Sequence, residues 1–197
     1  MVKIINKTRA NALVLYFSIY YTYEIKGEII MKKIITKYDN NGNKIYIKYS
    51  NGREEWYKYN ENGKLIHLKD SNGVEVWFDY NEDGNLIHIK GSKGNEEWFD
   101  ENGNCIHYKD SDGFEKWYNE NGRCIHIKNS KGYEEWYNEN GNLIHRKEPR
   151  FEVWFDYDEN GKCIHYKDSS GYEEYKKYDE NGKLIHRINS YEYGIPR

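Results

Sequence analysis

The sequence predicts an all-β protein built from tandem β-hairpins of about 20 residues each. Three observations predict it: seven histidines each follow Leu-Ile or Cys-Ile, six tryptophans recur ahead of them, and glycine turn sequences separate the segments. One copy runs from Gly113 to Gly132 and then begins again. Repetition at a fixed period is typical of repeat architectures. We therefore expect an elongated, twisted antiparallel meander sheet, single-layered or coiled, of about 14–16 strands.

Turn sequences define the strands of each copy. Glu-Asn-Gly, as at Gly103, alternates with Ser-x-Gly, as at Gly132, and short alternating runs lie between them. Asn-Gly between such runs is a strong hairpin signal because glycine supplies a positive φ. Each copy is thus predicted to hold two antiparallel strands, which gives about fifteen strands from Lys44 to Ile188.

The histidine spacings are 21, 19, 19, 19, 20 and 21 residues. Long copies insert two residues after the aromatic pair, as in Trp77–Tyr80 compared with Trp117–Asn119. Two added residues preserve the alternation of side chains between faces, whereas one would reverse it. The spacing of 20 combines this insertion with a one-residue deletion in the turn 148–151.

Composition limits the size of the core. The 197 residues have a mean hydropathy of −1.11, 32% charged residues and 17% aromatic residues, which predicts strands with shallow burial. The net charge of −3 gives no field that would gather nucleic acid. The abundance of Lys, Ile, Asn and Tyr indicates an AT-rich genome, such as that of a low-GC bacterium or its phage.

The three cysteines, Cys105, Cys124 and Cys163, occupy a position that leucine fills in other copies. Cysteine there is expected to pack as a small hydrophobic residue, and an odd number does not indicate a disulfide framework. This favours a reducing compartment.

The first thirty residues differ from the rest. They contain an apolar run that is too short to span a bilayer as a helix, and no small-residue cleavage site follows. We expect translation to start at Met31, with 1–30 an upstream extension or a poorly ordered segment, 31–190 the repeat domain of seven to eight copies, and 191–197 a tail. The protein would then be cytoplasmic and not inserted in a membrane. If 1–30 is an export segment, it would be secreted or on the cell surface.

Alternation assigns the side chains to two faces. Cys105, His107 and Lys109 are expected on one face, with Glu96, Trp98, Glu115 and Trp117 of the adjoining strands. The opposite face collects Ile106, Tyr108, Phe114, Lys116 and Tyr118, and we expect it to be the more buried. The candidate partner-binding residues on the exposed face are Trp77, Trp98, Trp117, Trp136, Trp154, His88, His107, His126, His145, Lys90, Lys109 and Lys128.

Several motifs resemble a known family. Tyr157-Asp-Glu-Asn-Gly-Lys-Cys and Tyr175-Lys-Lys-Tyr-Asp-Glu-Asn-Gly-Lys-Leu resemble the YD repeats of Rhs and teneurin-like proteins, and Trp-x-x-Tyr-x-Glu-Asn-Gly-Lys-Leu resembles MORN-variant repeats. The resemblance covers about 38–188. It implies a meandering sheet without enzymatic activity. Large Rhs proteins build shells from such sheets, but this array is too short to enclose a domain. The Trp-Tyr hairpins are also similar to choline-binding and glucan-binding repeats, although the second tryptophan per repeat is absent.

The same pattern weighs against metal binding and catalysis. Equivalent strands of adjacent copies lie about 9.5 Å apart in a meander, too far for their histidines to share one zinc ion. A catalytic residue would interrupt the repeat, and no nucleophile motif does so. No cofactor is expected.

The function predicted is therefore non-enzymatic protein binding, with an inhibitor as the favoured form: an immunity or antitoxin protein, or a phage-borne inhibitor of a host nuclease or of a defence complex such as CRISPR. Two alternatives stay open, a surface module that binds glycans or cell wall and a single-stranded nucleic-acid binder that uses the Trp, His and Lys face. The partner and the oligomeric state are open.

Overall fold

A computed structural model describes residues 15–25 and 28–191, with side chains from residue 34 onward. All regular structure in this part of the chain is β-strand. The strands are β1 (Leu15–Ile25), β2 (Glu28–Tyr38), β3 (Lys44–Lys48), β4 (Glu54–Tyr59), β5 (Leu65–Asp70), β6 (Glu75–Tyr80), β7 (Leu86–Gly91), β8 (Glu96–Phe99), β9 (Cys105–Lys109), β10 (Glu115–Tyr118), β11 (Cys124–Lys128), β12 (Glu134–Tyr137), β13 (Leu143–Glu148), β14 (Phe151–Tyr157), β15 (Cys163–Asp168), β16 (Glu173–Tyr178) and β17 (Leu184–Asn189). The all-β prediction is confirmed, and β3 to β17 are the fifteen strands expected from Lys44 onward.

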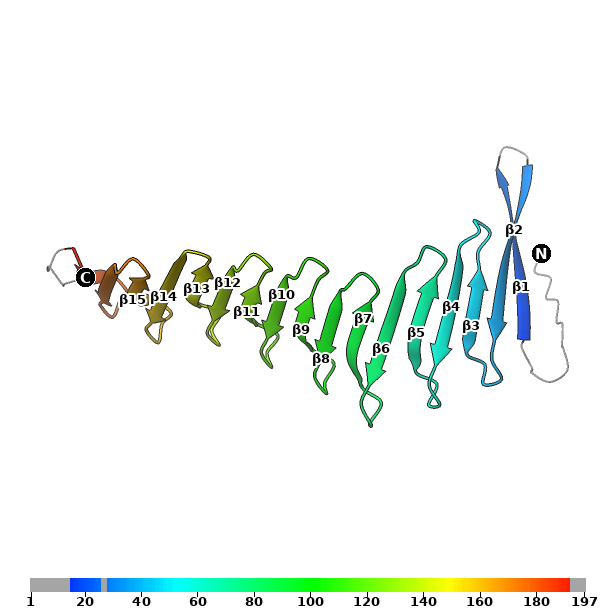
Figure 1. Cartoon of the computed structure of the whole chain (residues 1–197), viewed down its shortest axis with the longest axis horizontal. Coiled ribbons are helices and arrows are strands. Elements are labelled where there is room, and N and C mark those ends of the chain that lie inside the picture. Colours follow the sequence, from blue (N-terminus) through cyan, green and yellow to red (C-terminus); the bar gives the residue numbers. More distant parts are fainter. Residues whose placement is uncertain (1–14, 26–27, 192–197) are drawn as a thin grey trace. The chain divides into compact units, whose positions relative to one another are not determined.

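The chain divides into two compact units, with the boundary between Gly94 and Asn95. Within each unit, every strand is antiparallel to the next strand in sequence, as Figure 1 shows for β3 to β7. Strands in the described part contact only their neighbours in sequence, so no second layer covers either face of these sheets. The predicted antiparallel meander is therefore confirmed.

The first two strands form a long hairpin. Pairing between β1 and β2 runs from Leu15 opposite Tyr38 to Ile25 opposite Glu28. Met31 lies within β2, and its role as the start of translation stays a prediction. The rest of the predicted N-terminal segment (1–14 and 26–27) and most of the predicted tail (192–197) lie outside the described residues.

The glycine turns have a uniform geometry, which the turn at Gly103 illustrates. Gly103 has a φ of 83°, and its N–H donates to the carbonyl of Asp100 over 3.1 Å. The Asp100 carboxylate accepts the backbone N–H groups of Asn102 and Asn104 at 2.9 and 2.8 Å. Each hairpin with a glycine turn is thereby closed by four residues, the last of which is in the left-handed region that favours glycine.

A β-bulge follows this turn. Trp98 pairs with His107, but Phe99 pairs with Cys105, so Ile106 has no partner in the register. Equivalent shifts occur in β2–β3, β4–β5, β6–β7, β10–β11, β12–β13, β14–β15 and β16–β17. The pairs joined by the turns at Gly52, Gly73, Gly113, Gly132 and Gly171 show no such shift. The extra residue interrupts the alternation between Cys105 and His107, so these two side chains lie on opposite faces.

The bulge corrects the predicted position of the cysteines. Cys105 was expected on the same face as His107, but the register places it opposite Phe99, on the other face. Burial raises the pKa of the Tyr118 hydroxyl, and the nearby Cys105 and Cys124 thiols raise it further, as expected if these cysteines lie on the same face as Tyr118. The prediction was wrong because it assumed unbroken alternation through a bulged strand.

We call the two sides the tryptophan face, represented by Glu115, Trp117 and His107, and the tyrosine face, represented by Tyr118 and Tyr108. The most buried side chains all belong to the tyrosine face: Thr36, Ile47, Glu55, Asp70, Val153, Asp168 and Glu174. This confirms that the tyrosine face is the more buried one. Ile106 is an exception to that prediction at 38% exposure, because the bulge removes it from the pairing.

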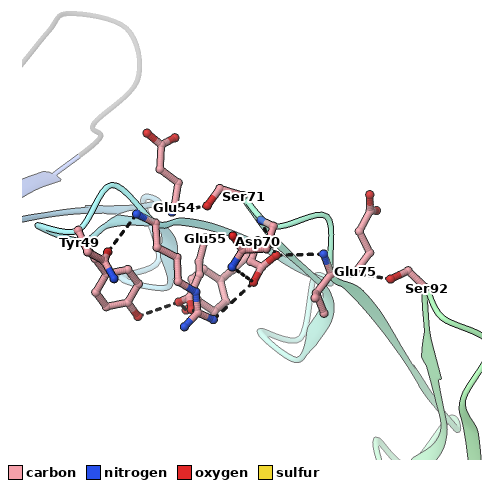
Figure 2. A network of polar contacts seen from close by, with 12 residues as sticks. Tyr49, Glu54, Glu55, Asp70, Ser71, Glu75 and Ser92 are labelled. Atoms are coloured by element: carbon pink, nitrogen blue, oxygen red, sulfur yellow. Dashed lines mark hydrogen bonds and ion pairs between the residues drawn. The ribbon is translucent and has the colours of Figure 1, made fainter.

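Polar contacts rather than a deep core link successive hairpins (Figure 2). Glu55 accepts the Tyr49 hydroxyl at 2.9 Å and pairs with Arg53 at 2.8 Å, and the backbone N–H of Glu54 donates to the Ser71 hydroxyl at 3.0 Å. Ser71 follows Glu54 by seventeen residues, so this bond joins the start of one hairpin to the turn after it. The Glu55 carboxylate can be buried because it has hydrogen-bond and ion-pair partners. Polar groups can therefore fill positions that apolar residues would occupy in a chain of higher hydropathy.

Candidate partner-binding face

The second unit carries an unbroken row of stacked rings on its tryptophan face. Neighbouring rings have centroids 4.3–5.1 Å apart and planes inclined by 9–20°. The rings of this aromatic ladder are Trp98, His107, Trp117, His126, Trp136, His145 and Trp154. Cross-strand aromatic pairs stabilise sheets, so the row gives part of the stability that an interior would otherwise give.

Each ladder histidine also contacts a glutamate of the following strand. His107 Nε2 lies 3.0 Å from Glu115 Oε2, and His126 Nε2 lies 3.3 Å from Glu134 Oε2. This contact fixes the ring orientation in which the imidazole stacks on tryptophan. The predicted proximity of histidine to tryptophan and glutamate is confirmed.

Lysines and glutamates border the ladder. Lys109 pairs in register with Glu96 and Glu115, and Lys128 Nζ lies 3.6 Å from Glu115 Oε1. Lys147 continues the row 3.9 Å from Glu152. The predicted placement of lysine beside glutamate on this face is thus also confirmed.

Two-residue insertions end the ladder. In the long hairpin of β14 and β15, Trp154 is opposite Lys167, and His165 is opposite Asp156. His165 instead stacks on Tyr175 at 4.4 Å. The insertion preserves the faces, as predicted, but shifts the register by two residues and separates tryptophan from histidine.

The first unit has the same arrangement at its candidate residues. Trp77 stacks on His67 at 5.2 Å, whereas the register places Lys90 on its other side and His88 opposite Asp79. His88 Nδ1 lies 3.0 Å from Asp79 Oδ2. Of the residues predicted for the site, Trp77, His88 and Lys90 are therefore together on one hairpin of the first unit.

The one-residue deletion in the turn 148–151 changes the contact between a ladder histidine and its glutamate. His145 Nε2 is 3.6 Å from Glu152 Oε2 and, like Arg146 Nε, is a buried nitrogen without a hydrogen bond. Glu152 follows His145 by seven residues, whereas Glu115 follows His107 by eight. The shorter turn thus weakens the histidine contact while the stack on Trp154 persists at 5.1 Å.

Stacking limits the ligands that this face can hold. Trp117 lies between His107 and His126, at 4.5 and 4.4 Å, so both sides of its indole are covered. Only the ring edges of such inner indoles then face solvent. Sugars and nucleobases bind aromatic residues mainly through open ring faces, so the ladder interior does not suit them.

The arrangement offers little for metal binding or nucleophilic catalysis. An indole separates each ladder histidine from the next, and no group of three or more His, Cys, Asp or Glu among the described residues is arranged to hold a metal. Burial raises the pKa of the Cys105, Cys124 and Cys163 thiols, which disfavours the reactive thiolate. The described residues contain no helix long and apolar enough to cross a membrane.

Sequence reasoning missed a second set of contacts, on the tyrosine face. The Glu135 carboxylate accepts hydrogen bonds from the hydroxyls of Tyr133 and Tyr137. Burial, followed by this hydrogen bond, raises the pKa of Tyr137. The signal was the spacing Tyr-x-Glu-x-Tyr, which places all three side chains on one face of a strand.

Known proteins place the chain in a family. Among solved structures, it is similar to the TcdB2-TccC3-Cdc42 structure (12% identity, TM-score 0.39, covering 90% of this chain and 14% of that one). It is also similar to TcdB2-TccC3 without its hypervariable C-terminal region (11% identity, TM-score 0.33, 90% and 13%). The chain thus spans about a seventh of those chains. No curated protein matches. The model of the Teneurin YD-shell family matches residues 74–195, more than half of the sequence, and the chain belongs to this family of YD repeat proteins.

Proposed function

We propose that this YD-shell repeat module is non-enzymatic and binds a partner protein on its tryptophan face. The observation that carries the proposal is the ladder from Trp98 to Trp154, bordered by lysines and glutamates on a sheet that no second layer covers in the described part. Tryptophan and tyrosine supply most of the binding energy at many protein interfaces.

A protein suits this face better than a glycan or a single strand of nucleic acid. Covered ring faces exclude stacking ligands from the ladder interior, whereas indole edges beside ion pairs match the mixed polarity of protein interfaces. The lysines are balanced by glutamates, and the chain has a net charge of −3, so electrostatic attraction for nucleic acid is weak.

The finer proposal is that binding inhibits the partner. A small repeat module without a catalytic site acts by covering a surface, as an immunity protein, an antitoxin or a phage-borne inhibitor of a nuclease or defence complex would do. Thiols kept reduced in the cytoplasm fit this proposal.

Affinity capture from the native host with matched charge reversals tests the proposal. The variant K128E/K147E reverses two lysines whose side chains are 44% and 47% exposed on the tryptophan face. K93E/K131E makes the same charge change at exposed turn positions. We expect one stoichiometric partner to be captured by the wild type and by the turn variant but not by K128E/K147E. Equal capture by all three, or binding to cell-wall fractions alone, would contradict the proposal.

A further inference from the structure

The indoles at the ends of stacked segments differ from those inside the ladder. Trp154 stacks one face on His145, and the register places Lys167, not a ring, beside the other face. Trp77 likewise stacks on His67 and faces Lys90. These two indoles are 37% and 38% exposed, and each offers one face on which a planar group can stack.

A carboxylate accompanies each of these indoles. Asp79 follows Trp77, and Asp156 follows Trp154, by two residues on the same face, and the two carboxylate side chains are 65% and 70% exposed. One oxygen of Asp156 is held 2.8 Å from His165 Nδ1. This contact orients the carboxylate, while most of the side chain remains open to solvent.

We propose that the Trp-Phe-Asp sequences of two long hairpins, Trp77–Asp79 in β6 and Trp154–Asp156 in β14, each bind an arginine side chain of the partner protein. The third such sequence, Trp98–Asp100, differs because the Asp100 carboxylate accepts the turn N–H groups of Asn102 and Asn104. The guanidinium stacks on the open indole face and donates two N–H groups to the carboxylate of Asp79 or Asp156, as the lysine beside the indole turns toward solvent. Residues two apart on a strand are separated by about 7 Å, a distance that a stacked guanidinium spans. Arginine suits the site because its planar group both stacks and forms forked hydrogen bonds, which an ammonium does not.

The other two long hairpins provide the contrast. The residue two after Trp56 is Lys58, and the residue two after Tyr175 is Lys177, and both lysines are exposed. These positions have an exposed aromatic ring but a positive neighbour, so they repel a guanidinium. Among these long hairpins, charge therefore restricts arginine binding to Trp77–Asp79 and Trp154–Asp156.

The inference rests on the proposed protein binding and is tested separately, with octa-arginine and octa-lysine as probes of equal charge. Calorimetric titration of the full chain is expected to give about fivefold tighter binding of octa-arginine. Among the six indole N–H resonances, those of Trp77 and Trp154 should shift more than that of Trp117.

The matched variants are D79N/D156N and D83N/D112N, the second at exposed turn positions, with folding checked by thermal melts. We expect D79N/D156N to remove the preference for arginine and D83N/D112N to retain it. Equal affinity for the two peptides, or equal losses of octa-arginine affinity in the two variants, would show that binding is bulk charge attraction. Either result would rule out the arginine sites. The proposed function would still stand if partner capture remained sensitive to K128E/K147E.

Discussion

His107 and Trp117 lie face to face across β9 and β10, with centroids 4.5 Å apart and 9° between their planes. The opposite face of Trp117 stacks on His126 at 4.4 Å. Among the side chains described from residue 34 onward, Ile47 and Val153 are the only buried apolar residues. Cross-strand stacks and ion pairs therefore replace a core as the source of cohesion between strands.

The first prediction compares an inner with a terminal indole. W117A removes two stacks and W154A removes one, so W117A should lower the free energy of unfolding by about 0.5–1.5 kcal/mol more than W154A. Urea unfolding followed by circular dichroism measures both losses. Equal losses would show that stacking on the second face adds nothing.

Much of the fold was predictable because the same turn sequences and the same alternation of side chains recur in every copy of the repeat. The turn glycines and the alternation around Trp117 define the strands and place tryptophan, histidine, lysine and glutamate together. The bulge at Ile106 was not predictable from alternation, since a single unpaired residue leaves the hydrophobic pattern intact. Only the register shows that Cys105 belongs to the tyrosine face.

The extent of the ladder was also hidden in the sequence. An inserted pair of residues keeps each side chain on its face, as the sequence predicts. This rule cannot distinguish the stacked pair Trp117–His126 from the separated pair Trp154–His165, because both pairs lie on the tryptophan face. Which histidine meets which indole depends on the register, and the register depends on hairpin length. The candidate residues were therefore placed on the right face without their division into inner and terminal positions.

The second prediction uses hairpin length directly. Deleting Phe155 and Asp156 converts the long hairpin to the short form, so Trp154 should stack on His165 and extend the ladder to Tyr175. The variant should fold, and NMR contacts between the Trp154 and His165 rings would report the new stack. Deleting Asp156 alone reverses the faces of β15 relative to β14 and should unfold this region. A folded single deletion with unchanged melting would contradict this account.

The third prediction concerns acid stability through Glu174, which is 6% exposed on the tyrosine face. Burial acts to raise its pKa, but contacts with Lys176 and Arg187 outweigh burial and hold the pKa below the ordinary value of 4.5. A carboxyl with a lowered folded pKa stabilises the protein above its unfolded pKa, and this stability is lost as pH falls through the folded pKa. Melting temperature should thus fall as pH drops below 4.5.

The control for this effect is a matched pair of glutamines. E174Q should be less stable than wild type at pH 7 and should lose less stability on acidification, since the titrating group is gone. E180Q, at an exposed turn position, should retain the wild-type acid profile. Identical acid profiles for E174Q and wild type would rule out Glu174 as a contributor.

The fourth prediction separates backbone strain from steric contact at two turns. Gly103 has a φ of +83° with open space where a Cβ would lie, so G103A should cost only the strain of the left-handed region, about 1–2 kcal/mol. Gly113 has a φ of +81°, and a Cβ there would lie 3.1 Å from Ser130 Cβ in the next copy, so G113A should cost more. G103N should lose less than G103A because asparagine tolerates this conformation. Urea denaturation of the three variants measures these differences, and the steric part of the argument fails if G113A is no less stable than G103A.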